Sequence, residues 1–124
     1  MSKSPDKRMA AYIPIDVYSL GVAVFRNEKR RAAVLRDQGC DDIADGNPAA
    51  LASAYRDYAN DGTVRLSMVL KRGTTRATWA HECVHIADFV MDHVGIPLGI
   101  DNTEVRAYLV GHLFAHLDTC EALQ

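Results

Sequence analysis

The sequence predicts an α+β fold, in which a small antiparallel or mixed sheet with a β-hairpin packs on an N-terminal helix and a C-terminal helical hairpin. Three observations predict it: an early stretch rich in β-branched and aromatic residues, two extended runs separated by a tight-turn sequence, and a helical period after Gly73. The 124 residues suffice for one domain and are too few for two. We expect a single domain over residues 1–124, with 1–11 flexible.

Two strands are expected near the start of the chain. Tyr12–Tyr18 and Val22–Phe25 are rich in β-branched and aromatic residues, and Pro14 and Gly21 interrupt them. These compositions favour strand over helix.

A helix is expected over about residues 27–38. Its composition consists of strong helix formers, and Gly39 follows where a helix commonly stops. The basic cluster Lys29, Arg30 and Arg31 falls within it, and we expect these side chains to form a solvated polar face.

A β-hairpin is expected from two extended runs, residues 51–58 and 63–71. The linking Asn60, Asp61 and Gly62 tolerate the positive φ angles of a tight reversal. Apolar residues alternate along the second run, so we expect one buried face, formed by Val64, Leu66, Met68 and Leu70, and one face that is not buried.

Two helices are expected in the C-terminal half. The first runs from about Thr75 to His93 and buries one apolar side, with Thr74 or Thr75 able to cap its start. Gly95 and Pro97 end it, and a second helix follows from about residue 102 or 103 to residue 120.

Composition excludes several classes of protein. Apolar residues make up 48% and charged residues 24%, which is typical of a globular chain, and the net charge of −2 argues against a nucleic-acid binder. No apolar run is long enough to span a membrane, and the start does not resemble a secretory signal. Three cysteines without a C-x-x-C pair favour reduced thiols, so we expect a cytoplasmic protein. The oligomeric state is not indicated.

The first C-terminal helix contains the pattern H-E-x-x-H as His81-Glu82-Cys83-Val84-His85. Residues four apart on an α-helix lie on the same face, so both imidazoles can bind a single metal ion. Glu82 is offset by roughly 100° from His81, which lets its carboxylate reach a water on the ion. Accidental placement of these residues on a helix surface is the alternative interpretation.

A catalytic zinc ion (Zn²⁺) ordinarily has three protein ligands and one open position. Glu104, in the first turn of the next helix, is the best third ligand, and Asp101 is the nearest competitor. Asp88, on the same helix face as the histidines, suits a role of accepting a hydrogen bond from a ligand. Two imidazoles and a carboxylate suit zinc, although iron, cobalt or manganese accept similar ligands.

The arrangement of HECVH followed by Glu104 resembles the gluzincin group of zinc metallopeptidases. The spacing is close to that of thermolysin-like enzymes. In size the chain is more similar to minimal single-domain members, and HECVHIADF with DNTEVRAYLVGHLF resembles small phage- or prophage-encoded proteins of this type. The likeness covers about residues 64–116.

The resemblance implies a zincin-like fold and a peptidase in which Glu82 is the general base and then carries the proton to the leaving amine. It also implies that a peptide docks in extended form on an edge strand, here residues 63–71. An oxyanion-stabilising residue is implied as well, with Tyr108 as first choice; the alternatives are Arg106, His112 and His116.

Two departures from the family pattern qualify these expectations. Tyr108 stands where thermolysin-like members have an Asp that orients a histidine, and no G-x-M-E-N aminopeptidase motif occurs. The second hypothesis is therefore a zinc-stabilised binding or regulatory module with weak or no proteolytic activity. If the protein is phage-encoded, its compartment is the host cytoplasm.

Overall fold

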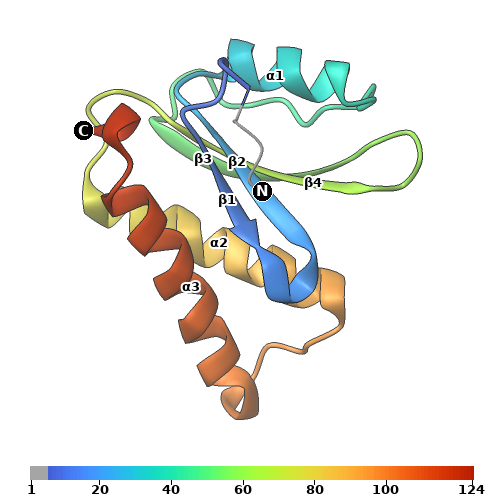
Figure 1. Cartoon of the computed structure of the whole chain (residues 1–124), viewed down its shortest axis with the longest axis vertical. Helices are drawn as coiled ribbons and strands as arrows, with labels where there is room; N and C mark the ends of the chain where they lie inside the picture. The colour runs from blue at the N-terminus through green and yellow to red at the C-terminus, as the bar shows by residue number, and fades with distance from the viewer. Residues whose placement is uncertain (1–5) are drawn as a thin grey trace.

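The computed structural model describes residues 6–124 and confirms the α+β class. Its sheet has four strands: β1 (Ala11–Ile15), β2 (Leu20–Phe25), β3 (Ala52–Tyr58) and β4 (Val64–Leu70). The strand order is β1-β2-β4-β3 (Figure 1). Pairs β1–β2 and β3–β4 are antiparallel and β2–β4 is parallel, so the sheet is mixed.

Three helices cover the two faces of this sheet. Helix α1 (Glu28–Asp37) packs on one face, and α2 (Arg76–Val94) and α3 (Thr103–Asp118) pack as an antiparallel hairpin on the other (Figure 1). Three short 3-10 helices connect or end these elements: Asp16–Tyr18, Ile100–Asn102 and Glu121–Leu123. The helical hairpin and the β-hairpin confirm the arrangement expected from the sequence.

The first expected strand is too long at its end. Residues Asp16–Tyr18 form a 3-10 turn instead of continuing β1, and Ser19 takes a left-handed conformation with φ 53°. The chain needs this reversal because Ile15 and Leu20 are paired partners in the antiparallel β1–β2 ladder.

The largest core cluster lies between the sheet and the α2–α3 hairpin, and it contains the four apolar residues expected on one face of β4. The expectation that the other face of β4 is not buried is wrong. Ser67 and Val69 are both buried, because α1 covers that side of the sheet. Alternation of apolar residues identified the strand but could not show that a helix lies over its second face.

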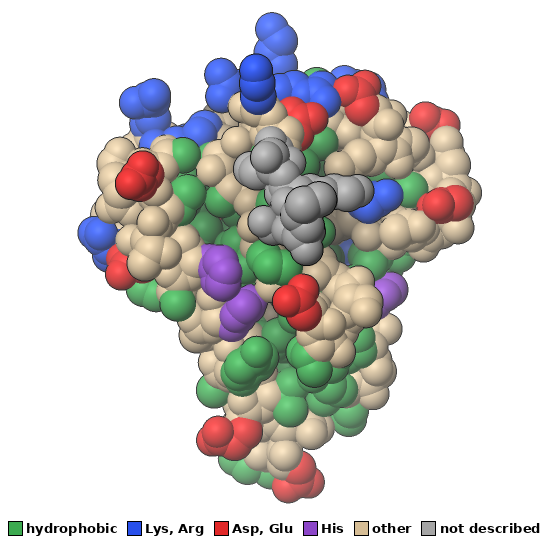
Figure 2. Space-filling view, in the orientation of Figure 1, with side chains coloured by type: hydrophobic (Ala, Val, Ile, Leu, Met, Phe, Trp, Pro, Cys, Tyr) green, Lys and Arg blue, Asp and Glu red, His purple; other side chains and the backbone are tan. Residues whose placement is uncertain are grey.

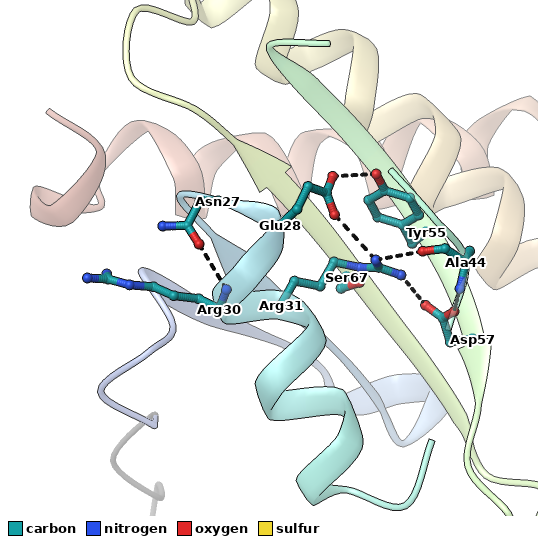
Figure 3. A network of polar contacts seen from close by, with 8 residues as sticks. All are labelled: Asn27, Glu28, Arg30, Arg31, Ala44, Tyr55, Asp57 and Ser67. Carbon is teal, nitrogen blue, oxygen red and sulfur yellow. Dashed lines mark hydrogen bonds and ion pairs between the residues drawn. The ribbon is translucent and has the colours of Figure 1, made fainter. Parts of the chain in front are cut away.

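The expectation for the basic cluster is also wrong at one position. Lys29 and Arg30 are exposed, whereas Arg31 is 1% exposed. Its guanidinium donates from Nη2 to Asp57 Oδ2 at 2.5 Å (Figure 3) and from Nε to Ser67 Oγ at 3.0 Å. Burial of this cation is tolerated because a carboxylate neutralises it and hydrogen bonds satisfy its nitrogens.

Part of the N-terminal segment expected to be flexible, residues 1–5, lies outside the described residues. The rest is attached to the fold. Arg8 forms an ion pair with Asp37 of α1 at 2.8 Å, and the amide of Ala10 donates to the carbonyl of Val24 at 2.7 Å.

Lys and Arg side chains gather at the end of the molecule where α1 lies (Figure 2). Lys29, Arg30 and Arg36 are exposed on that helix. Of the helices formed by residues 6–124, none combines the length and apolar character that crossing a membrane requires.

Candidate metal centre

Helix α2 carries the H-E-x-x-H pattern on a well-anchored scaffold. The hydroxyl of Thr75 caps its start by accepting from the amide of Thr78, and Gly95 ends it with φ 80°. One side of the helix is buried in the main core by Trp79, Cys83, Ile86, Ala87 and Val90. This packing fixes which way the opposite side of α2 faces.

The structure brings His81, Glu82 and His85 together, with one ligand atom from each lying within 4.8 Å of the others. Both histidines are exposed, and their Nε2 atoms are 3.1 Å apart. Nitrogens bound at about 2.0–2.1 Å to a tetrahedral ion would lie about 3.3–3.4 Å apart. The two imidazoles are thus already close to the separation that a shared ion requires.

Glu82 differs from the histidines in being buried, with 8% of its side chain exposed against 69% for His81. Its Oε1 lies 4.0 Å from His81 Nε2. Burial raises the pKa of Glu82 above its usual value, because removing the carboxylate from water disfavours its charged form, and the nearby histidines only partly offset this.

The residues fit a metal with a coordinated water. Glu82 Oε2 is buried and has no hydrogen-bond partner, which is costly for a carboxylate oxygen unless a water or ion satisfies it. Two solvent-facing imidazoles and one buried carboxylate form a donor set that zinc accepts. These residues therefore suit a metal ion that is bound by the two histidines, with the Glu82 carboxylate beside it.

Acids flanking the histidines on α2 are already engaged by arginines. Asp88 accepts two hydrogen bonds from Arg106 of α3, at 2.8 and 3.1 Å, so it is paired across the helical hairpin and does not orient a histidine. Asp92 forms an ion pair at 2.6 Å with Arg56 of β3. Asp92 was not singled out from the sequence, although its position seven residues after His85 places it on the same face.

Glu104 is not brought to the histidines. Glu104 is exposed in the first turn of α3, and nine residues at about 100° each place it on the opposite side of the helix from the fully buried Leu113. Asp101 lies exposed in the 3-10 turn before α3. Within residues 6–124, no further His, Cys, Asp or Glu joins the group.

The residues considered for oxyanion stabilisation lie on α3 in other surroundings. Tyr108 is exposed and stacks on His112, with ring centroids 6.0 Å apart. His112 Nε2 lies 2.7 Å from the carbonyl oxygen of Pro14 in β1. His116 Nδ1 is 3.1 Å from the carbonyl of His112. Tyr108 therefore belongs to a stack that contacts β1, and Arg106 is held by Asp88.

The strand expected to bind a peptide is not at an edge. Residues of β4 pair with β2 on one side and with β3 on the other, so its backbone groups are used within the sheet. The edges belong to β1 and β3. Of these two, β3 lies beside α2, as the Arg56–Asp92 ion pair shows.

Compared with known proteins, the chain matches no family model, no curated protein and no solved structure.

Proposed function

We propose that the protein is a zinc-dependent peptidase whose metal is held by His81 and His85. The observation that carries the proposal is the meeting of two exposed imidazoles with a buried carboxylate whose Oε2 has no partner. Zinc bound there would polarise a water molecule and lower its pKa.

Glu82 is the general base of this proposal. A buried carboxylate with a raised pKa is a stronger base than an exposed one, because burial destabilises its charged form. Glu82 takes a proton from the attacking water and transfers it to the leaving amine nitrogen. Its position beside His81 and His85, and its unpartnered oxygen, support this role.

The peptide substrate is proposed to lie along β3. In the part of the chain that the structure describes, no strand pairs with the outer side of β3, and β3 lies next to α2, so an extended segment could add to the sheet near the histidines. The proposal moves the docking strand from residues 63–71 to Ala52–Tyr58, because only an edge can accept another strand.

A second candidate is a metal-stabilised binding or regulatory module. One observation favours it: Glu104 lies away from the histidines, whereas a catalytic zinc ordinarily has three protein ligands. In this candidate the metal binds His81 and His85 on the exposed face of α2 and stabilises the protein, and no peptide is cleaved.

Metal analysis combined with a cleavage assay tests the proposal. Zinc content is measured after dialysis for the native protein and for variants His81→Ala, Glu82→Gln and His116→Ala, and each is then incubated with a library of unstructured peptides. His81→Ala is expected to lose both zinc and cleavage, and Glu82→Gln to keep zinc and lose cleavage. His116→Ala is the matched control, since this exposed histidine lies outside the group.

The outcomes separate the candidates. Zinc at one equivalent without cleavage by the native protein would favour the binding module. Absence of zinc, or equal zinc content in His81→Ala and His116→Ala, would refute both candidates. Cleavage by Glu82→Gln at the native rate would remove Glu82 from the mechanism.

The compartment proposed is the cytoplasm, or the host cytoplasm if the protein is phage-encoded. The free thiols of Cys40, Cys83 and Cys120 support a reducing environment.

A further inference from the structure

A cavity of about 410 Å³ lies where the two hairpins of the sheet diverge. Strands β2 and β4 pair only from Val22 and Leu66 onward. The residues before these points pair outward instead, Leu20 and Gly21 with β1, and Val64 with β3. Figure 1 shows the β1–β2 turn and the β3–β4 turn pointing in different directions. Residues of both hairpins line the cavity.

The cavity is separate from the candidate metal centre. None of His81, Glu82 and His85 lines it, and the α2 residue that does is His93. His93 follows His85 by eight residues, about 12 Å along the helix axis. A ligand in the cavity would therefore occupy a second site.

The lining of the cavity combines apolar and aromatic side chains with polar ones, such as Ser19, Gln38 and Thr63, and with positive charge. Met9, Tyr12, Tyr18 and Leu35 contribute apolar and aromatic groups, and Arg65 contributes a cation. Among residues 6–124, no Asp or Glu lines it, although the chain has 16 acidic residues against 14 Lys and Arg. The volume lies within the usual range for small-molecule pockets, about 300–1,000 Å³.

Arg65 has no partner within the described chain. Its Nε is buried without a hydrogen bond, and its guanidinium forms no ion pair among residues 6–124. Its neighbour across the β3–β4 ladder is Asp57, but that carboxylate is held by Arg31 and by the amide of Ala44. The other arginines that are not fully exposed all have a side-chain or backbone acceptor: Arg8, Arg26, Arg31 and Arg56.

We propose that this cavity binds a small carboxylate with an apolar or aromatic body, and that Arg65 pairs with the carboxylate. A planar guanidinium matches the two oxygens of a carboxylate and can bind both at once. The two tyrosine rings and the aliphatic side chains of the lining can contact a hydrophobic body, whereas a single arginine suits one carboxylate better than a multiply charged phosphate ester. The carboxylate can belong to a free organic acid or to the C-terminus of a peptide.

Titration with phenylacetate and its neutral analogue phenylacetamide tests the proposal. Binding to the native protein is measured by calorimetry and amide chemical shifts after chelation of metal, because carboxylates also bind zinc. We expect saturable phenylacetate binding that is at least about tenfold weaker for phenylacetamide and for Arg65→Gln, as loss of a charged hydrogen bond implies. Arg72→Gln, at an exposed arginine outside the cavity, should bind as the native protein does.

A second variant tests the aromatic wall. A Cβ at Gly21 would lie 1.8 Å from the hydroxyl oxygen of Tyr12, so Gly21→Ala must displace that ring. We expect weaker binding of phenylacetate and unchanged binding of acetate. Circular dichroism verifies that each variant is folded.

The outcomes decide both the site and the source of the ligand. If a peptide ending in Phe binds more tightly than phenylacetate and loses binding when its C-terminus is amidated, the ligand is a protein C-terminus. If phenylacetate binds more tightly than the peptide, the ligand is a free acid. Equal binding of phenylacetate to native protein and Arg65→Gln, or of phenylacetamide and phenylacetate to the native protein, would overturn the proposal. Absence of saturable binding by every probe would do so as well.

Discussion

The buried ion pair between Arg31 and Asp57 makes a quantitative prediction about stability. Their side chains are 1% and 2% exposed, and Nη2 of Arg31 lies 2.5 Å from Asp57 Oδ2. The guanidinium also donates to the carbonyl of Ala44 at 3.1 Å and lies 3.5 Å from the ring centroid of Tyr55 (Figure 3). Asp57→Asn keeps the shape of the side chain but removes the buried charge that pairs most closely with Arg31.

The expected loss in free energy of unfolding is up to about 3–5 kcal/mol, because the carboxylate that remains near Arg31, that of Glu28, is farther away at 3.4 Å and more exposed. This is a large share of the roughly 5–15 kcal/mol that stabilises an ordinary domain. The double variant Arg31→Met with Asp57→Leu should lose less than Asp57→Asn alone, since neither charge is then buried.

Urea unfolding followed by circular dichroism measures these differences. The matched control is Asp118→Asn, which removes the partner of Arg76 in an exposed ion pair between α2 and α3. Exposed pairs contribute up to about 1 kcal/mol, so the control should change little. A loss for Asp57→Asn as small as that for Asp118→Asn would refute the reasoning that burial makes this pair indispensable.

Three further predictions concern single residues. Burial raises the pKa of Glu82, so the metal-free protein should lose stability as pH rises from the unfolded pKa, about 4.3, through the higher pKa of the folded protein. Glu82→Gln should then be the more stable protein at neutral pH in thermal melts, and the advantage should vanish in acid. Burial raises the pKa of Cys83 to about 12 and also raises that of Cys40, so iodoacetamide should label the partly exposed Cys120 first in native protein, as peptide mass mapping would show. Gly95→Ala should cost about 1 kcal/mol in urea unfolding, because alanine resists the φ of 80° that ends α2; an unchanged midpoint would contradict that.

Local patterns in the sequence determined most of the elements and the core of the candidate site. Thr75 and Gly95 marked the ends of α2 because capping and positive φ depend on neighbouring residues only. For the same reason, the four-residue spacing of His81 and His85 was enough to place both imidazoles on one helix face.

Contacts between distant segments decided what the sequence could not. Glu104 was expected beside the histidines, but the packing of α3 through its leucine stripe turns this side chain to solvent. Arg31 was assigned to a solvated face, but the strand carrying Asp57 lies beneath it. Strand β4 was expected at an edge, but β2 pairs alongside it. In each case the local sequence was compatible with more than one orientation of the side chain, or with more than one neighbour of the strand. Burial of apolar surface across the whole fold selected the one that the structure shows.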